Sequence, residues 1–162
     1  MLTKIRKLGD PVLTIQAHPI LLHKEKPLDL IGMMFDVMYE AGGVGLAANQ
    51  VGVTKSLFVY DDMQGNKGYV ANPRYWSEDQ KVIDIDEGCL SVPGRHHPTP
   101  RFETISMIGT TDINGTVSEW TNVGGLLGQI FQHETDHLNG KLYITKLPKE
   151  TQMAIVLANQ VI

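Results

Sequence analysis

The order of secondary-structure signals predicts an α+β fold, in which antiparallel β-sheets pack around a central, buried helix. An amphipathic helical segment comes first, five short β-rich segments follow, and a second helical segment comes after them. This order differs from the regular alternation of strands and helices that builds a parallel sheet. The second helical segment is apolar on two neighbouring faces, which indicates that it lies inside the molecule.

The first helical signals lie in the N-terminal quarter. Asp10-Pro11 begins a short helical turn, because Asp is a favourable N-cap and Pro suits the first helical position. Residues 27–40 are predicted to form an amphipathic helix, and Gly42-Gly43 ends it. Its apolar face carries Leu28, Ile31, Phe35 and Met38.

Five segments rich in β-branched or aromatic residues, each bounded by Gly, Asn, Asp or Pro, are predicted to be strands. They cover residues 55–60, 69–72, 81–86, 104–109 and 116–120. Between the last two, Asn114-Gly115 supplies a hairpin turn, because both residues tolerate a positive φ.

Residues 124–139 are predicted to form the central helix, with Gly140 at its C-terminal end. One face carries Leu126, Ile130, His133 and His137. The adjacent face carries Leu127, Phe131, Glu134 and Leu138. From Pro148 onward we expect a last short helix, whose inward residues are Met153, Val156 and Leu157.

Length and composition predict a single domain over residues 1–162, with a short C-terminal segment. Apolar residues make up 42% of the chain and charged residues 20%, which is typical of a globular protein. The net charge of −4 disfavours direct binding to nucleic acid or to an anionic membrane surface. A lone cysteine, no signal peptide and no apolar stretch of the ~18 residues that a membrane span needs favour a cytoplasmic protein.

An HExxH motif, His133-Glu134-Thr135-Asp136-His137, lies in the predicted central helix. Residues four apart lie on one side of a helix, so both imidazoles can reach one metal ion. Glu134 is then placed to take a proton from metal-bound water. The alternative is a pair of hydrogen-bonded core histidines, although burying them with a glutamate is costly without a partner.

Cys89 is a third ligand candidate, because it directly follows a predicted strand and has Gly88 beside it. One thiolate and two imidazoles leave a fourth tetrahedral position for water, as in catalytic metal sites. The alternative is that Cys89 is a small buried apolar residue.

Gly43–Gln50 forms a third distinctive segment, rich in Gly and Ala. Small residues let the backbone approach a ligand closely, but they also suit a tightly packed loop that ends a helix. The segment lacks the Lys-Ser/Thr ending of a phosphate loop, and it follows a helix instead of the strand that a dinucleotide site requires.

Together these three segments resemble the motifs of the peptide deformylase family, GΦGΦAAxQ, EGCΦS and QHExDHLxG, where Φ is apolar. Here they are Gly43–Gln50, Glu87–Ser91 and Gln132–Gly140. The three in this order are very specific, and the resemblance extends from about Gly9 to Leu142, including Asn72-Pro73.

The resemblance implies an α+β fold like that of the family and removal of the N-formyl group from the initiator methionine of new polypeptides. Cys89, His133 and His137 would bind the metal, with Glu134 as general acid/base. The side-chain amide of Gln50 and the backbone N–H of Leu90 would stabilise the oxyanion. The family's metal is typically Fe²⁺, replaceable by Zn²⁺, Ni²⁺ or Co²⁺. The expected partner is a formyl-methionyl nascent peptide, bound by a monomer that can contact the ribosome.

The expected substrate pocket joins the glycine loop to the helix. Val44, Leu126 and Ile130 would hold the methionine side chain, although Leu126 and Ile130 are also consistent with ordinary core packing. The backbone at Gly43 and Gly45 can pair with an extended peptide.

Two features depart from the common bacterial pattern of the family. At the position of His96 the resemblance implies an arginine that holds the substrate backbone or orients the glutamate of the EGCLS motif. Arg95 lies one position away, and Arg101 matches a second family arginine. We expect His96 and His97 to be solvated loop residues and retain Arg95 as a binding candidate. The segment after Pro148 is shorter than the expected C-terminal helix, which resembles a minimal form of the family and bears on ribosome contact.

Two other function classes fit the sequence less well. A zincin-like metallopeptidase would need a later His or Glu as its third ligand, but no histidine follows His137 and Glu150 is the only later glutamate. A catalytically inactive binding domain is disfavoured by the intact Glu134 and Gln50.

Overall fold

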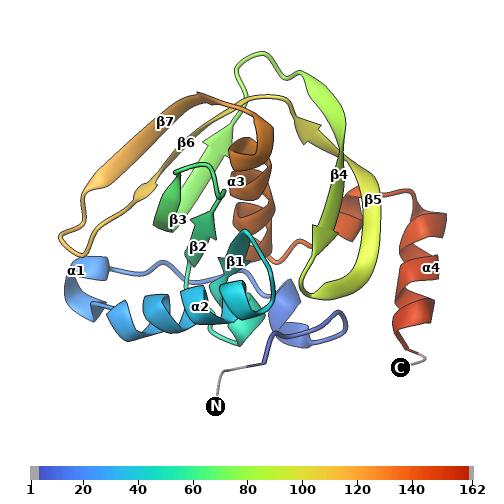
Figure 1. Ribbon diagram of the computed structural model, residues 1–162, viewed down its shortest axis with the longest axis horizontal. Coiled ribbons are helices and arrows are strands. Elements are labelled where there is room, and N and C mark those ends of the chain that lie inside the picture. Colours follow the sequence, from blue (N-terminus) through green and yellow to red (C-terminus); the bar gives the residue numbers. More distant parts are fainter. Residues whose placement is uncertain (1–3, 161–162) are drawn as a thin grey trace.

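The computed structural model describes residues 4–160 and contains two antiparallel sheets (Figure 1). The five-stranded sheet has the order β1-β2-β3-β6-β7, and β4 pairs with β5 in the second sheet. The strands are β1 (Gly45–Ala47), β2 (Leu57–Asp61), β3 (Lys67–Trp76), β4 (Val82–Cys89), β5 (Val92–Phe102), β6 (Ile105–Thr110) and β7 (Val117–Val123). The helices are α1 (Leu22–Glu25), α2 (Leu28–Glu40), α3 (Gly125–Leu138) and α4 (Lys149–Asn159). Short 3-10 helices are η1 (Pro11–Thr14), η2 (Ala48–Val51) and η3 (Tyr143–Lys146).

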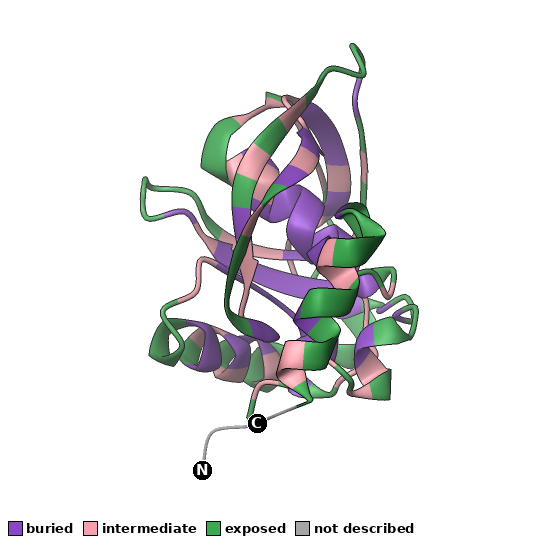
Figure 2. Ribbon diagram, turned by 90° about the vertical axis from the view of Figure 1, so that its right-hand side faces the viewer, coloured by how far each residue is buried: buried purple, intermediate pink, exposed green. Residues whose placement is uncertain are grey.

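Helix α3 lies between the five-stranded sheet and the β4–β5 hairpin (Figure 1). It contacts β1, β2 and β3 on one side. On the other side Gln132 joins it to β5, because its side chain accepts from the Phe102 N–H and donates to the Phe102 carbonyl. Every residue from Ile130 to Leu138 is buried, so this part of the helix is coloured purple in Figure 2. A helix enclosed on two sides explains why two of its faces are apolar.

Antiparallel pairing is confirmed in both sheets. Both long predicted helices are present, and each of the five predicted strands has a counterpart within a few residues. The predicted hairpin turn is confirmed as well, since the Gly115 N–H donates to the Asp112 carbonyl and Gly115 has a φ of 89°. Asp10 caps η1 through the Val12 N–H, as its position before Pro11 predicted.

Strands β1 and β5 were not predicted. β1 has only three residues, and it forms because Gly45, Leu46 and Ala47 pair with β2. β5 contains three prolines, at positions 93, 98 and 100, which normally argue against a strand. They are tolerated because β5 belongs to a two-stranded sheet and needs ladder bonds only toward β4.

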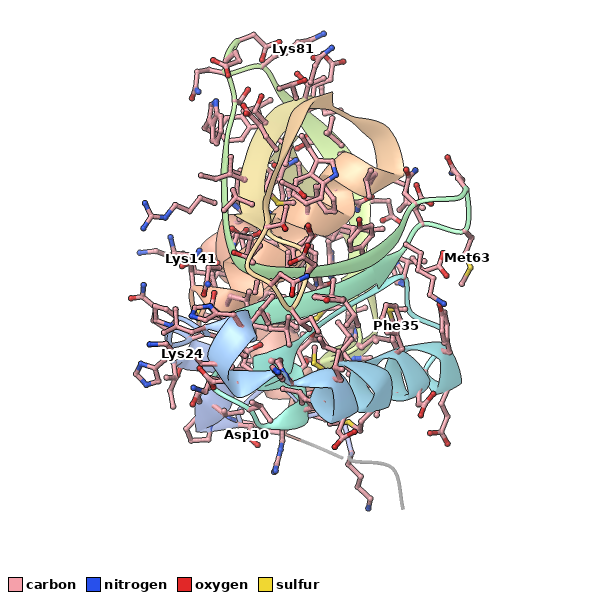
Figure 3. All side chains as sticks on the ribbon, turned by 90° about the vertical axis from the view of Figure 1, so that its left-hand side faces the viewer. Asp10, Lys24, Phe35, Met63, Lys81 and Lys141 are labelled. Carbon is pink, nitrogen blue, oxygen red and sulfur yellow. The ribbon has the colours of Figure 1, made fainter. Side chains whose placement is uncertain are left out.

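The buried apolar residues form three hydrophobic clusters. Helix α2 covers the β1–β2 region through Met34 and Met38, which are fully buried. Phe131 of α3 packs against Phe58 and Tyr60 of β2. Met63, in the β2–β3 connection, lies outside the core and projects into solvent (Figure 3).

Helix α4 is present, but its predicted inward face is wrong. Met153, Val156 and Leu157 are 64%, 38% and 59% exposed, whereas Ile155 is the buried residue. Residues 153–157 are all apolar, so helical periodicity could not select the face that packs.

No helix within residues 4–160 has the length and apolar character needed to cross a membrane.

Candidate metal centre and active site

Three potential metal ligands from distant parts of the sequence meet at the buried side of a cavity. Cys89 ends β4, and His133 and His137 lie one turn apart on α3. The Cys89 Sγ lies 3.2 Å from His137 Nε2, and the two Nε2 atoms are 3.2 Å apart. The ligand atoms of all three residues lie within 4.8 Å of one another. The structure therefore brings together the sulfur and the two ring nitrogens that the sequence analysis singled out.

The donor set fits a divalent cation. Bond lengths of about 2.0–2.1 Å to nitrogen and about 2.3 Å to sulfur give roughly 3.3–3.6 Å between tetrahedral ligand atoms. Two of the three separations, from His137 Nε2 to Cys89 Sγ and to His133 Nε2, are 3.2 Å and thus close to this range. A thiolate and two imidazoles suit Zn²⁺, Fe²⁺, Ni²⁺ or Co²⁺ better than Mg²⁺ or Ca²⁺. Glu150, the alternative ligand of a zincin-like site, is exposed in the first turn of α4 and lies outside this group.

Glu87 fixes the orientation of His133, because its Oε1 accepts a hydrogen bond from Nδ1 of the ring. The Nε2 atom of His133 then faces Cys89 and His137. Arg101 in turn holds Glu87 through two bonds, at 2.8 Å from Nε and 2.5 Å from Nη2. The arginine that holds the glutamate of the EGCLS motif is therefore Arg101. The bond between Glu87 and His133 is a further role, which the position of Glu87 in that motif could have indicated.

The electrostatics of the site favour a thiolate at Cys89. Burial raises the pKa of the thiol, but the imidazoles of His137 and His133 outweigh burial, so that the pKa lies well below its usual value. Burial lowers the pKa of His133, but its hydrogen bonds to Cys89 and Glu87 raise the pKa by more than burial lowers it. The pKa of His133 therefore lies above its usual value. A preformed thiolate is the form that binds a metal ion.

Glu134 is buried beside this group without being one of its ligands. It is 4% exposed, and its Oε2 has no hydrogen-bond partner within residues 4–160. Burial raises the pKa of its carboxyl above the usual value, and the nearby His133 and His137 oppose that shift. The carboxylate also lies against Gly45, where an added Cβ would be 2.5 Å from Oε1. Gly45 therefore leaves the space that the Glu134 side chain occupies.

Gln50, in η2, is oriented by two hydrogen bonds. Its Oε1 accepts from the Ala47 N–H at 2.9 Å, and its Nε2 donates to Ser91 Oγ at 3.1 Å. The same Nε2 lies 3.8 Å from Cys89 Sγ. The amide donor thus faces the ligand group, and Ser91 is a further site residue that the sequence analysis left without a role.

A cavity of about 570 Å³ opens above these residues. Its lining includes all the predicted substrate-binding and catalytic residues, which are Gly43, Val44, Gly45, Gln50, Leu90, Leu126, Ile130 and Glu134. Cys89 and His133 also line it, whereas His137 is fully buried beneath. Arg95 and His96 lie at its rim, and His96 belongs to β5, not to the loop expected from the sequence. His97 is likewise part of β5.

The Glu87–Arg101 pair predicts how the metal-free protein responds to acid. Burial alone would raise the pKa of Glu87, but Arg101 and His133 lower it from 4.5 to about 2. A carboxyl whose pKa is depressed by folding stabilises the protein above its unfolded pKa and loses that contribution as the pH falls. We therefore expect the free energy of unfolding of the chelator-treated protein to drop by roughly 3 kcal/mol between about pH 4.5 and about pH 2 from this group.

Urea unfolding of the metal-free protein across this pH range measures the effect. Glu87→Gln should be less stable at neutral pH and should show a flatter dependence on pH in the acid range. An identical acid slope in both proteins would contradict the pairing.

Comparison with known proteins gives a consistent result. The family model described as polypeptide deformylase matches residues 2–153. The chain is 41% identical over 155 residues to peptide deformylase 1 of Corynebacterium efficiens, covering 93% of this chain and 90% of that protein. It is 42% identical over 146 residues to the peptide deformylase of Halothermothrix orenii, covering 89% and 92%. Among solved structures, the peptide deformylase of Legionella pneumophila matches with a TM-score of 0.88 and 36% identity, covering 97% of this chain and 92% of that one. That of Thermus thermophilus matches with a TM-score of 0.87 and 36% identity, covering 99% and 95%.

Proposed function

The chain belongs to the peptide deformylase family, and we propose that it removes the N-formyl group of new polypeptides with a divalent cation held by Cys89, His133 and His137. One observation carries the proposal of a metal-dependent reaction. The three ligand atoms converge at the buried side of a cavity, with the unpartnered carboxylate oxygen of Glu134 beside them. This arrangement offers a metal site, a base and room for a substrate together.

We propose Fe²⁺ as the metal, with Zn²⁺, Ni²⁺ or Co²⁺ as substitutes. The mixed sulfur and nitrogen donor set supports a first-row transition metal of this kind but does not discriminate among these ions. When bound, such a cation supplies Lewis acidity, which acidifies water and polarises a carbonyl oxygen.

Glu134 is proposed to move the proton. As a carboxylate it takes a proton from the water that attacks the formyl carbon, and it then passes that proton to the leaving amine. Its buried position beside the ligands supports this role, because its Oε2 has no hydrogen-bond partner among the described residues, whereas Glu87, which also lines the cavity, is held by Arg101. The products are formate and a peptide with a free N-terminal amine.

Gln50 and Leu90 are proposed to stabilise the charge that develops on the formyl oxygen. The Gln50 side chain is held in place before substrate arrives, since Ala47 and Ser91 fix both ends of its amide. Leu90 directly follows Cys89, so its backbone N–H lies next to the metal site in the chain. Donors fixed in advance stabilise an oxyanion without having to reorganise.

Gln50→Ala should reduce kcat by roughly two to three orders of magnitude, because removing one oxyanion donor costs about 2.7–4 kcal/mol. Bound metal should stay stoichiometric, since Gln50 lies outside the ligand group. Steady-state kinetics with a formylated tripeptide and elemental analysis of the same sample test both parts. A loss confined to KM would assign Gln50 to ground-state binding instead.

The substrate is proposed to lie along β1. This strand is at the edge of the five-stranded sheet, so an extended peptide can add beside Gly43–Gly45. The methionine side chain would enter the apolar part of the cavity between Val44, Leu126 and Ile130. Gly43 leaves the space that the Leu90 side chain occupies, because a Cβ at this position would lie 2.7 Å from that side chain.

The proposed function is tested by formate release from formyl-Met-Ala-Ser under anaerobic conditions with Fe²⁺. We expect formate in amounts that rise with time and enzyme, and none from the chelator-treated protein. An acetyl-Met-Ala-Ser control should remain intact, and so should the internal peptide bonds of the substrate. Formate no higher than in the metal-free blank, or cleavage of internal bonds, would reject the proposal.

A further inference from the structure

A second polar cluster lies behind the metal centre, on the side of α3 that faces β3 and β5. Asp136 is the fourth residue of the HExxH motif, and its side chain is 8% exposed. It receives a hydrogen bond from Arg101 Nη1 at 2.5 Å and another from the Tyr75 hydroxyl at 3.0 Å. Lys146 Nζ lies 3.5 Å from the same carboxylate. The mechanism proposed above uses none of Asp136, Tyr75 and Lys146.

This cluster is connected to the metal centre through two ion-paired residues. Asp136 holds one end of the Arg101 guanidinium, and Glu87 holds the other end through Nε and Nη2. Glu87 then accepts from His133 Nδ1. A continuous hydrogen-bonded path therefore leads from the Tyr75 hydroxyl to a ring whose Nε2 belongs to the ligand group.

Lys146 offsets the charge that Asp136 adds to the Glu87–Arg101 pair. Arg101 has a side-chain exposure of 0% between two carboxylates, those of Glu87 and Asp136. Lys146 supplies the second positive charge, so two anions and two cations offset one another. If one partner of a buried pair is removed, the remaining charge is left uncompensated and its neighbours rearrange. Losing the carboxylate of Asp136 would therefore free one end of Arg101 and loosen its grip on Glu87.

On this basis we propose that Asp136, supported by Tyr75 and Lys146, is a positioning residue for the metal centre. It fixes Arg101, Arg101 fixes Glu87, and Glu87 fixes the ring of His133. The inference rests on the proposed function, because it requires that His133 bind the metal. Groups that orient a ligating histidine commonly change metal affinity by about 10–100-fold when they are lost.

The geometry allows this role to be separated from substrate binding. Tyr75 and Lys146 border a different cavity, of about 330 Å³, and neither lines the cavity above the metal ligands. Replacing Tyr75 or Lys146 therefore leaves the residues that line the substrate cavity unchanged. The effect of each replacement on metal binding can be measured in the absence of substrate.

Gln132 provides a matched control for a purely structural role. Like Asp136, it is a buried polar residue of α3 whose side chain ties the helix to β5, in this case at Phe102. Unlike Asp136, it has no hydrogen bond to Arg101 or Glu87 within the described part of the chain. Gln132→Leu should therefore lower the thermal stability and leave the metal centre unaltered.

The experiment uses the full-length protein loaded with Co²⁺, whose visible absorption reports the geometry of the ligands. For Asp136→Asn, Tyr75→Phe, Lys146→Met and Gln132→Leu, the spectrum, the rate of metal loss to a chelator and the melting temperature are measured. We expect metal loss to be about tenfold faster in Asp136→Asn and faster by a smaller factor in Tyr75→Phe, with altered Co²⁺ bands in both. Gln132→Leu should melt at a lower temperature than the parent protein, but its rate of metal loss and its Co²⁺ spectrum should equal those of the parent protein.

Equal rates of metal loss in Asp136→Asn and Gln132→Leu would overturn the inference, and so would an unaltered Co²⁺ spectrum in Asp136→Asn. If Asp136→Asn does not fold, Tyr75→Phe and Lys146→Met test the inference instead. Rates of metal loss and Co²⁺ spectra equal to those of the parent protein in both variants would overturn it. The proposed function fails separately, if the parent protein binds no Co²⁺ or releases no formate when loaded.

Discussion

Replacing Glu134 with glutamine is expected to abolish deformylation while leaving the bound metal in place. Glutamine has nearly the same shape, so it fits the space that Gly45 leaves beside the carboxylate. It cannot accept a proton from water, and it cannot return one to the leaving amine. A positioned general acid/base contributes about two to four orders of magnitude in rate, so kcat should fall by at least ~10²-fold.

Metal content should stay unchanged in this variant, because Glu134 is not a member of the ligand group. Formate release and elemental analysis on the same preparation test the two parts together. Glu103→Gln is the matched control: it makes the same chemical change at a residue that pairs with Lys81 outside the cavity. Loss of metal from Glu134→Gln would show that Glu134 supports the centre structurally, and turnover close to that of the parent protein would exclude it as the base.

The candidate site could be predicted because its chemistry is concentrated in short motifs. The spacing of His133 and His137 fixes two ligand atoms on one helix, whatever surrounds them. Cys89 is the only cysteine, so the choice of a sulfur ligand was not ambiguous. The contact between Cys89 and the two histidines joins residues that are far apart in the sequence. The resemblance to a family implied this contact, and the structure shows it.

The network behind the ligands could not be predicted from local patterns. Arg101 joins a strand to a helix 35 positions away, and Tyr75 reaches Asp136 across 61 positions. No periodicity or propensity encodes such pairings, because they depend on how the β4–β5 hairpin packs against α3. The same limit explains the missed strands, since β1 forms only when β2 is beside it and the prolines of β5 are tolerated only at a sheet edge.

Replacing Cys89 with serine is expected to remove most of the bound metal. The thiol is prepared for metal binding, since His137 and His133 bring its pKa well below the usual value despite burial. A serine hydroxyl stays protonated in the same environment and is a poor partner for soft or borderline metals. Loss of an outer-shell group commonly weakens metal binding by about 10–100-fold, so loss of a direct ligand should exceed ~100-fold.

Elemental analysis after dialysis against a metal-free buffer measures this loss, and added metal in excess should restore only part of the activity. Ser91→Ala is a useful control, because Ser91 lies two residues away and bonds Gln50, yet it is not a member of the ligand group. The two variants separate loss of the metal from loss of the oxyanion donor. Ser91→Ala should keep its metal and lower kcat by releasing Gln50, whereas Cys89→Ser should lose the metal while Gln50 stays held by Ala47 and Ser91. Full metal content in Cys89→Ser would mean that His133 and His137 bind the cation with some other third group, and the tetrahedral site proposed here would then be wrong.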